Sequence, residues 1–173
     1  MEKYNLNSDE WEYLIFAPFD IAIGVAGSDG HIAREELNPL ANFISQSSFL
    51  KDSLSRDIFG EIYDNGQEAW NKHKERLSKS SLKDNLQNVG RVLDKLEESI
   101  SEPYIENLLR LGMSTAFSYG DPNRPMSDQE INQIGHMFRW MNKDFEKYYK
   151  KISQKSKDVE NDAEDNKHRG QYL

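Results

Sequence analysis

The 173-residue sequence contains no cysteine, few prolines and no apolar run long enough to cross a bilayer. Without cysteine, the chain has no disulfide, no thiolate nucleophile and no cysteine ligand for zinc. Pro18 and Asp20 interrupt the longest apolar stretch, 13–27, whereas a membrane helix needs about 20 apolar residues. The first residues also lack the basic and then apolar pattern of a secretion signal. These absences predict a cytoplasmic protein without a transmembrane segment.

Positive charge is scarce as well. The chain has 22 Lys and Arg residues against 30 Asp and Glu residues, which gives a net charge of −8. Residues 1–48 carry most of this imbalance. Nucleic-acid binding depends on neutralising phosphates with Lys and Arg, so we expect no nucleic-acid partner. Cations or proteins suit this surface better, and we expect a protein partner, with the oligomeric state left open.

The spacing of apolar residues predicts an all-α protein. Steps of three and four residues recur through most of the chain, and no segment has the alternation of a strand. We therefore expect a single-domain bundle of about six or seven helices over residues 1–152, followed by a charged tail, 153–173, that is an extended helix or disordered. The helices are predicted at 8–28, 35–47, 50–62, 82–100, 102–119 and 127–150.

Three local signals refine this helix prediction. Pro18 lacks a backbone N–H, and we expect it to kink the first helix. The sequence Asp-Asn-Gly at 64–66 predicts a turn. The following segment, 67–79, is so polar that it predicts an exposed helix or a loop.

A weak internal duplication relates the two halves of the chain. Residues 19–29 are similar in character to residues 111–121, and residues 32–37 are similar to residues 126–131. Each copy consists of an apolar helix, an acidic bend and the start of a capped helix. Two apolar helices of this kind are expected to pack side by side, which brings the two bends to the same end of the bundle.

The duplication pairs four carboxylates, Asp29 with Asp121 and Glu36 with Glu130. If the bends meet, these side chains supply the oxygen ligands that Ca²⁺ or Mg²⁺ prefers. The alternative is that Asp29 belongs to a simple turn and that the two glutamates favour helix starts. Further candidate ligands of the same site are Asp20, His31 and Glu35.

Asp20 is unusual because it lies in the most apolar helix of the chain. A buried carboxylate needs a partner, or its pKa rises. Arg110 and Arg139 are the partners that we weigh for it. We favour a structural role for Asp20 over a functional one, since ordinary ion pairs also perturb pKa values.

The duplicated bends resemble those of the TerB-like family, the helical domains associated with tellurite resistance. The resemblance covers roughly residues 8–145 and rests on residues 26–32, Ala-Gly-Ser-Asp-Gly-His-Ile, together with Glu36. In the second bend, Arg124 and Pro125 stand where the family has Asp-Gly, so the second motif is degenerate. The resemblance implies a bacterial helical module whose clustered acids bind a divalent cation. It also implies a place in stress-response, defence-related or membrane-associated complexes, and no defined reaction.

Three functions follow from these patterns. The leading hypothesis is a non-enzymatic TerB-like module that binds Ca²⁺ or Mg²⁺ and a protein partner. The second is a metal-free interaction scaffold. The third is a metal-dependent hydrolase, which has the right acidic residues but no recognisable base or nucleophile. We therefore assign no catalytic residues.

Overall fold

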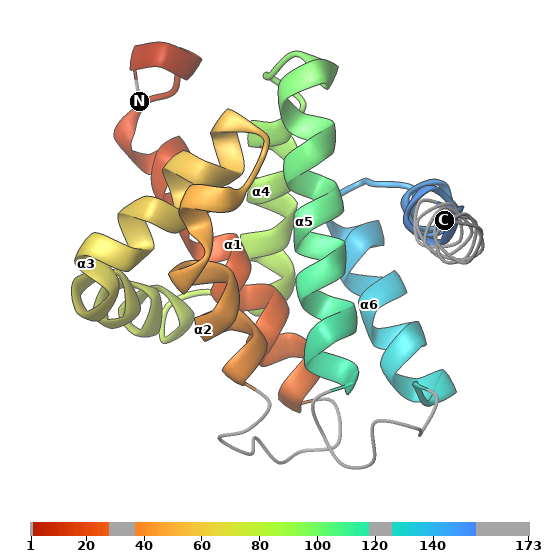
Figure 1. The fold of residues 1–173 in the computed structure, drawn as a ribbon. Coiled ribbons are helices and arrows are strands. Elements are labelled where there is room, and N and C mark those ends of the chain that lie inside the picture. The colour runs from red at the N-terminus through yellow and green to blue at the C-terminus, as the bar shows by residue number, and fades with distance from the viewer. Residues whose placement is uncertain (1, 28–36, 118–125, 155–173) are drawn as a thin grey trace, which may run out of the picture.

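The computed structural model of the chain describes residues 2–27, 37–117 and 126–154. Within these ranges the protein is a bundle of helices without strands, which confirms the predicted all-α single-domain fold (Figure 1). A further helix covers 145–154, and the rest of the predicted tail lies outside the described residues. None of the described helices is long and apolar enough to cross a membrane. The other helical elements are η1 (Glu2–Tyr4), α1 (Ser8–Ala26), α2 (Asn38–Ser45), η4 (Ser47–Phe49), α3 (Ser53–Leu77), α4 (Leu82–Leu93), α5 (Glu98–Phe117) and α6 (Asp128–Trp140).

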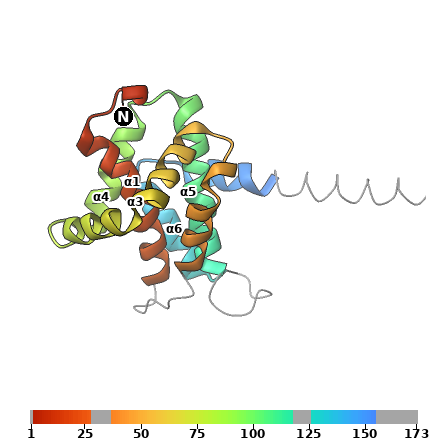
Figure 2. The same ribbon diagram turned by 60° about the vertical axis from the view of Figure 1, so that its left-hand side comes forward.

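The first long helix, α1, is the centre of the bundle. It contacts each of the helices α2 to α6, and most of its residues are buried (Figures 1 and 2). A helix that is apolar on nearly all sides is stable only inside a protein. Its start is fixed by a capping box, in which Asn7 and Glu10 bond each other's backbone N–H groups. The predicted first helix is thus confirmed, with an end close to the expected one.

Pro18 lies inside α1, and its missing N–H leaves the carbonyl of Leu14 without the usual helical partner. Tyr104 of α5 takes that place, because its phenol donates a hydrogen bond of 2.7 Å to the oxygen of Leu14. Burial raises the pKa of Tyr104 well above its usual value, so the phenol keeps its proton. The contact joins the two central helices at the proline.

We expect Tyr104→Phe to lower the free energy of unfolding by about 1–3 kcal/mol, the cost of a buried carbonyl left without a donor. Urea unfolding followed by circular dichroism measures this change. Tyr13→Phe is a matched control, because the Tyr13 hydroxyl only accepts a bond from the side chain of Asn88 in a partly buried contact. Equal losses in the two variants would contradict the role assigned to Tyr104.

The predicted turn at 64–66 is wrong. Helix α3 continues to Leu77 and only bends at Asn65, where φ is −125° and ψ is 24°. The polar segment beyond the bend buries one narrow face, formed by Ala69 and His73, while Trp70 packs against Phe19 of α1. This contact with a distant helix outweighs the local turn preference.

The predicted helix at 82–100 is also wrong in its length, because α4 ends at Leu93 and a new helix begins at Glu98. Similarly, the predicted helix 127–150 is two helices. Asn142 adopts a left-handed conformation, with φ of 56°. The N–H groups of Asn142 and Lys143 bond to the carbonyls of Arg139 and Phe138, the pattern of a Schellman motif. Side-chain periodicity continues through both breaks and therefore conceals them.

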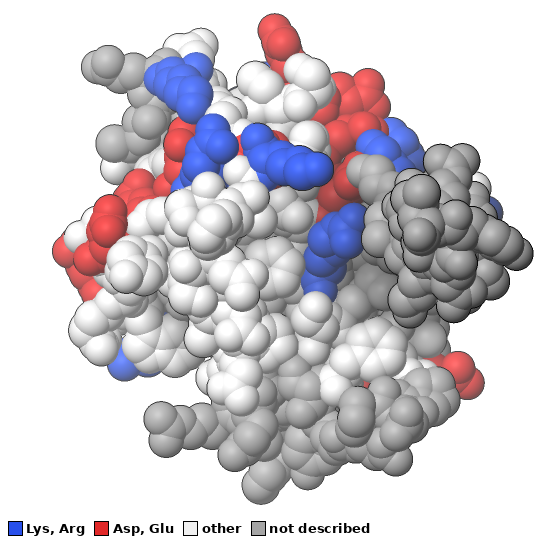
Figure 3. All heavy atoms as spheres, in the orientation of Figure 1, with Lys and Arg blue, Asp and Glu red and all other residues white. Residues whose placement is uncertain are grey.

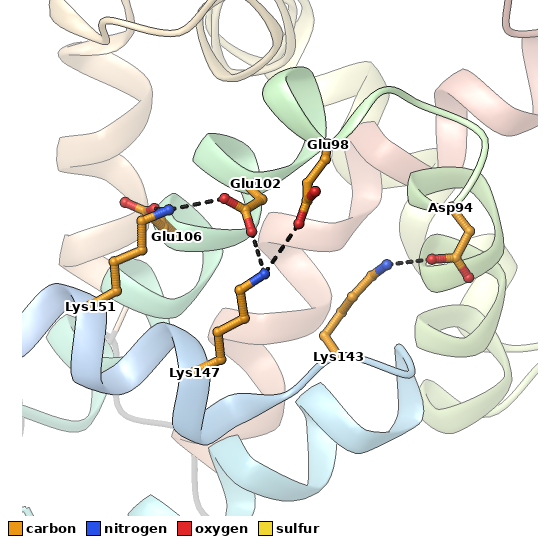
Figure 4. A network of polar contacts seen from close by, with 7 residues as sticks. All are labelled: Asp94, Glu98, Glu102, Glu106, Lys143, Lys147 and Lys151. Atoms are coloured by element: carbon orange, nitrogen blue, oxygen red, sulfur yellow. Dashed lines mark hydrogen bonds and ion pairs between the residues drawn. The ribbon is translucent and has the colours of Figure 1, made fainter.

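Helix 145–154 is attached to α5 by a ladder of ion pairs (Figure 4). Lys147 contacts Glu98 and Glu102, and Lys151 contacts Glu102 and Glu106. Hydrogen bonds from Lys147 and Lys151 lower the pKa of Glu102 to about 2. The ladder is therefore ionised at neutral pH.

Candidate functional site

Most of the predicted cation ligands lie outside the described residues. This applies to Asp29, His31, Glu35, Glu36 and Asp121. Among the residues that the structure does describe, no three His, Asp or Glu side chains form a group that suits a metal ion. The cation site therefore stays a prediction.

Glu130 is described, and it has the capping role that the sequence offered as the alternative. Its Oε2 atom accepts hydrogen bonds from the backbone N–H and the hydroxyl of Ser127, and the hydroxyl in turn accepts from the Glu130 N–H. These contacts form a capping box at the start of α6. Both bonds to the carboxylate use the same oxygen. Capping and cation binding are therefore not mutually exclusive.

The helix ends that flank the two acidic bends lie together at one end of the bundle. Figures 1 and 2 show α1 and α5 ending there and α2 and α6 beginning there. The last turns of α1 and α5 contain no basic residue. Each helix end carries a partial negative charge of roughly half an electron, which a nearby Lys or Arg commonly offsets. Here two such ends lie at the same end of the bundle, and within the described residues neither last turn holds a Lys or Arg.

The second described candidate, Asp20, is buried at the crossing of α1 and α3. Its Oδ1 atom lies 2.8 Å from Nε2 of His73, and both side chains are almost completely inaccessible. The partner is thus His73, and the expectation of Arg110 or Arg139 is wrong. One signal in the sequence indicates that His73 faces the core, because His73 follows Ala69 and Trp70 at helical spacing.

Aromatic rings and polar groups surround the pair. The rings of Phe16, Phe19 and Trp70 lie 5.3–5.7 Å from the His73 ring. Burial raises the pKa of Asp20, while the hydrogen bond to His73 lowers it in part. Because no solvent reaches either side chain, the pair is closed to a substrate, and we interpret it as structural.

A hollow of about 430 Å³ lies beside this pair, between α1, α3 and α4. Arg76 lines it, with its guanidinium 4.1 Å from the ring centre of Tyr13 and bonded to Glu12. Nη1 of Arg76 and Nδ2 of Asn85 are buried there beside Asp20, and both side chains lower the pKa of Asp20. Both atoms are donors and do not ligate a cation. The carboxylates that line the hollow, Glu12 and Glu75, are already paired with Lys or Arg side chains.

A larger groove opens on another face, between α5 and the segment formed by α2 and η4. It has a volume of about 450 Å³ and continues into a second hollow of about 600 Å³. Figure 3 views this face, whose middle is mainly uncharged and is bordered by Lys and Arg side chains with Asp and Glu side chains next to them. The residues that line both parts are Phe49, Leu50, Asn107 and Arg110.

Comparisons of the chain with family models, with curated proteins and with solved structures find no significant match. The TerB-like resemblance thus rests on the residues of the two bends alone.

Proposed function

We propose that the protein is a non-enzymatic, TerB-like helical module that binds Ca²⁺ or Mg²⁺ between its two acidic bends and works through a protein partner. The observation that supports this most is the pair of helix C-terminal ends, α1 and α5, which lie at one end of the bundle and have no basic residue in their last turns. Their partial negative charges favour a cation. The TerB-like resemblance adds a setting in a stress-response or defence-related complex.

Helix starts at the same end favour carboxylates as ligands. The N-terminal end of a helix carries partial positive charge, which stabilises acidic side chains near it. Glu130 occupies this position in α6, and the duplication gives Glu36 the corresponding position before α2. With Asp29 and Asp121 from the bends, the proposed site has hard oxygen ligands and a net negative charge, as Ca²⁺ and Mg²⁺ require.

Titration of the protein with Ca²⁺ and Mg²⁺, followed by NMR and calorimetry, tests this proposal. We expect Asp29→Asn to weaken cation binding by about tenfold or more, because it removes one ligand charge while keeping a turn-forming residue. Glu130→Gln is the sharper variant, since glutamine also serves in a capping box and stability should change little.

Glu97→Gln is the matched control, because Glu97 is exposed near the start of α5, at the opposite end of that helix. It should leave cation binding unchanged. Spectra of the wild-type protein that do not change up to millimolar metal would refute cation binding.

A specific observation favours the second candidate, a metal-free interaction scaffold. Phe49 on η4 is 83% exposed, and it borders the groove beside α5. A large apolar side chain exposed at a groove is a common feature of protein-binding surfaces. This function and cation binding use different residues and can coexist.

A further inference from the structure

The groove between α5 and the α2–η4 segment has a firm apolar wall. Phe43 of α2 lies at 5.5 Å from the ring of Phe59, which is fully buried in α3. The wall is thus anchored to the core, while Phe49 and Leu50 stand at its open edge. A partner side chain that enters here covers apolar surface on a preformed support, which favours binding.

Arg110 of α5 is the charged side chain that lines both parts of the groove. No described residue forms an ion pair or hydrogen bond with its guanidinium. The nearby acids are already engaged: Asp52 caps α3 and accepts a bond from Asn107, and Glu106 pairs with Lys151. Arg110 and Lys51 are thus the cations that line the groove, and the guanidinium of Arg110 has no acidic partner among the described residues, although the whole chain carries a charge of −8.

We propose that this groove binds an acidic segment of a partner protein, which rests on the partner-binding role proposed above but not on the cation site. An apolar side chain of the segment packs against Phe49 and Phe43, and a carboxylate of the segment pairs with Arg110. Arginine suits this task because its planar guanidinium holds a carboxylate through two parallel hydrogen bonds. The partner is thus distinguished by acidic and apolar residues side by side.

Fluorescence anisotropy with a short labelled peptide composed of Glu, Leu and Phe tests the proposal. A metal chelator is present throughout, so that the measured binding of the peptide depends on the groove and not on the cation site. The measurement uses physiological salt, where charges more than about 8 Å apart are largely screened and the net charge of the chain matters little. We expect Arg110→Gln to weaken binding of this peptide by about tenfold or more. Phe49→Ser should weaken it as well.

Arg91→Gln is the matched control, because Arg91 lies on the exposed side of α4 and, among the described residues, bonds only to Asn88. It should bind the peptide as the wild-type protein does. Circular dichroism confirms that each variant is folded. Three results would overturn the proposal. They are equal binding of a peptide with Lys in place of Glu, unchanged binding by Arg110→Gln, and no binding of the peptide at all. A concentration-dependent dimer that Phe49→Ser abolishes would assign the groove to a second copy of the chain and overturn it too.

Discussion

Asp20→Ala is expected to lower the free energy of unfolding by about 3–5 kcal/mol, because it removes one member of a buried polar pair and leaves the other without a partner. His73 is fully buried, and its Nδ1 atom already has no hydrogen-bond partner. After the substitution, Nε2 loses its partner as well. Urea unfolding followed by circular dichroism gives the change in free energy.

Asp20→Asn is the control for this experiment. Its side chain has nearly the same shape and can still form a hydrogen bond to Nε2 of His73, so the loss should be well below that of Asp20→Ala. A double-mutant cycle with His73→Ala should give a coupling energy of about 1–3 kcal/mol. Additive losses would show that the contact between the two side chains contributes nothing.

Asp20→Asn should also change how the free energy of unfolding depends on pH. Burial raises the pKa of Asp20, so the folded protein binds this proton more tightly than the unfolded chain does. The contribution of Asp20 to stability therefore falls as the pH rises from about 3.9, its unfolded value, through the folded pKa. Asp20→Asn should remove this fall, which appears as a difference between the pH profiles of the two proteins.

Gly90→Ala is expected to destabilise the protein by about 3 kcal/mol, despite the better helix propensity of alanine. A Cβ atom at Gly90 of α4 would lie 2.2 Å from the carbonyl oxygen of Met141 and 2.8 Å from its Cα atom. These are backbone atoms at the end of α6, and they cannot move aside as a flexible side chain can. Thermal and urea unfolding measure the loss.

Gly60→Ala is the matched control, because a Cβ atom there has nothing within 4 Å beyond its own stretch of helix. Gly60 also lies inside a helix, α3, so this variant should gain up to about 1 kcal/mol. Opposite signs for the two substitutions would confirm that close packing of α4 against the end of α6 requires glycine. Similar effects of the two would contradict it.

The helical pattern was predictable because it depends on neighbours along the chain. Apolar spacing located α1 and the first half of α3, and the pair Ser127 and Glu130 located the start of α6. Apolar spacing does not reveal the breaks near Asp94 and at Asn142, because it continues through them. A turn of this kind depends on one backbone conformation and barely alters the periodicity.

The candidate sites also include some features that the sequence reveals and others that it does not. The acidic bends were visible in the sequence because short motifs and internal similarity need no knowledge of packing. The partner of Asp20 is not visible in the sequence, because His73 lies 53 residues away and several basic residues are equally plausible. The groove at Arg110 was also not predicted, since its walls come from α2, η4 and α5.

The sequence by itself thus determined the all-α class, most helix positions and the acidic bends, which all follow from local spacing and composition. Only the tertiary structure decided that Asp20 pairs with His73, that Tyr104 replaces the hydrogen bond lost at Pro18, and that Arg110 faces an apolar groove. The physical reason is that these contacts depend on which helices cross and at what depth. Crossings are set by the packing of the whole core, and no local segment encodes them.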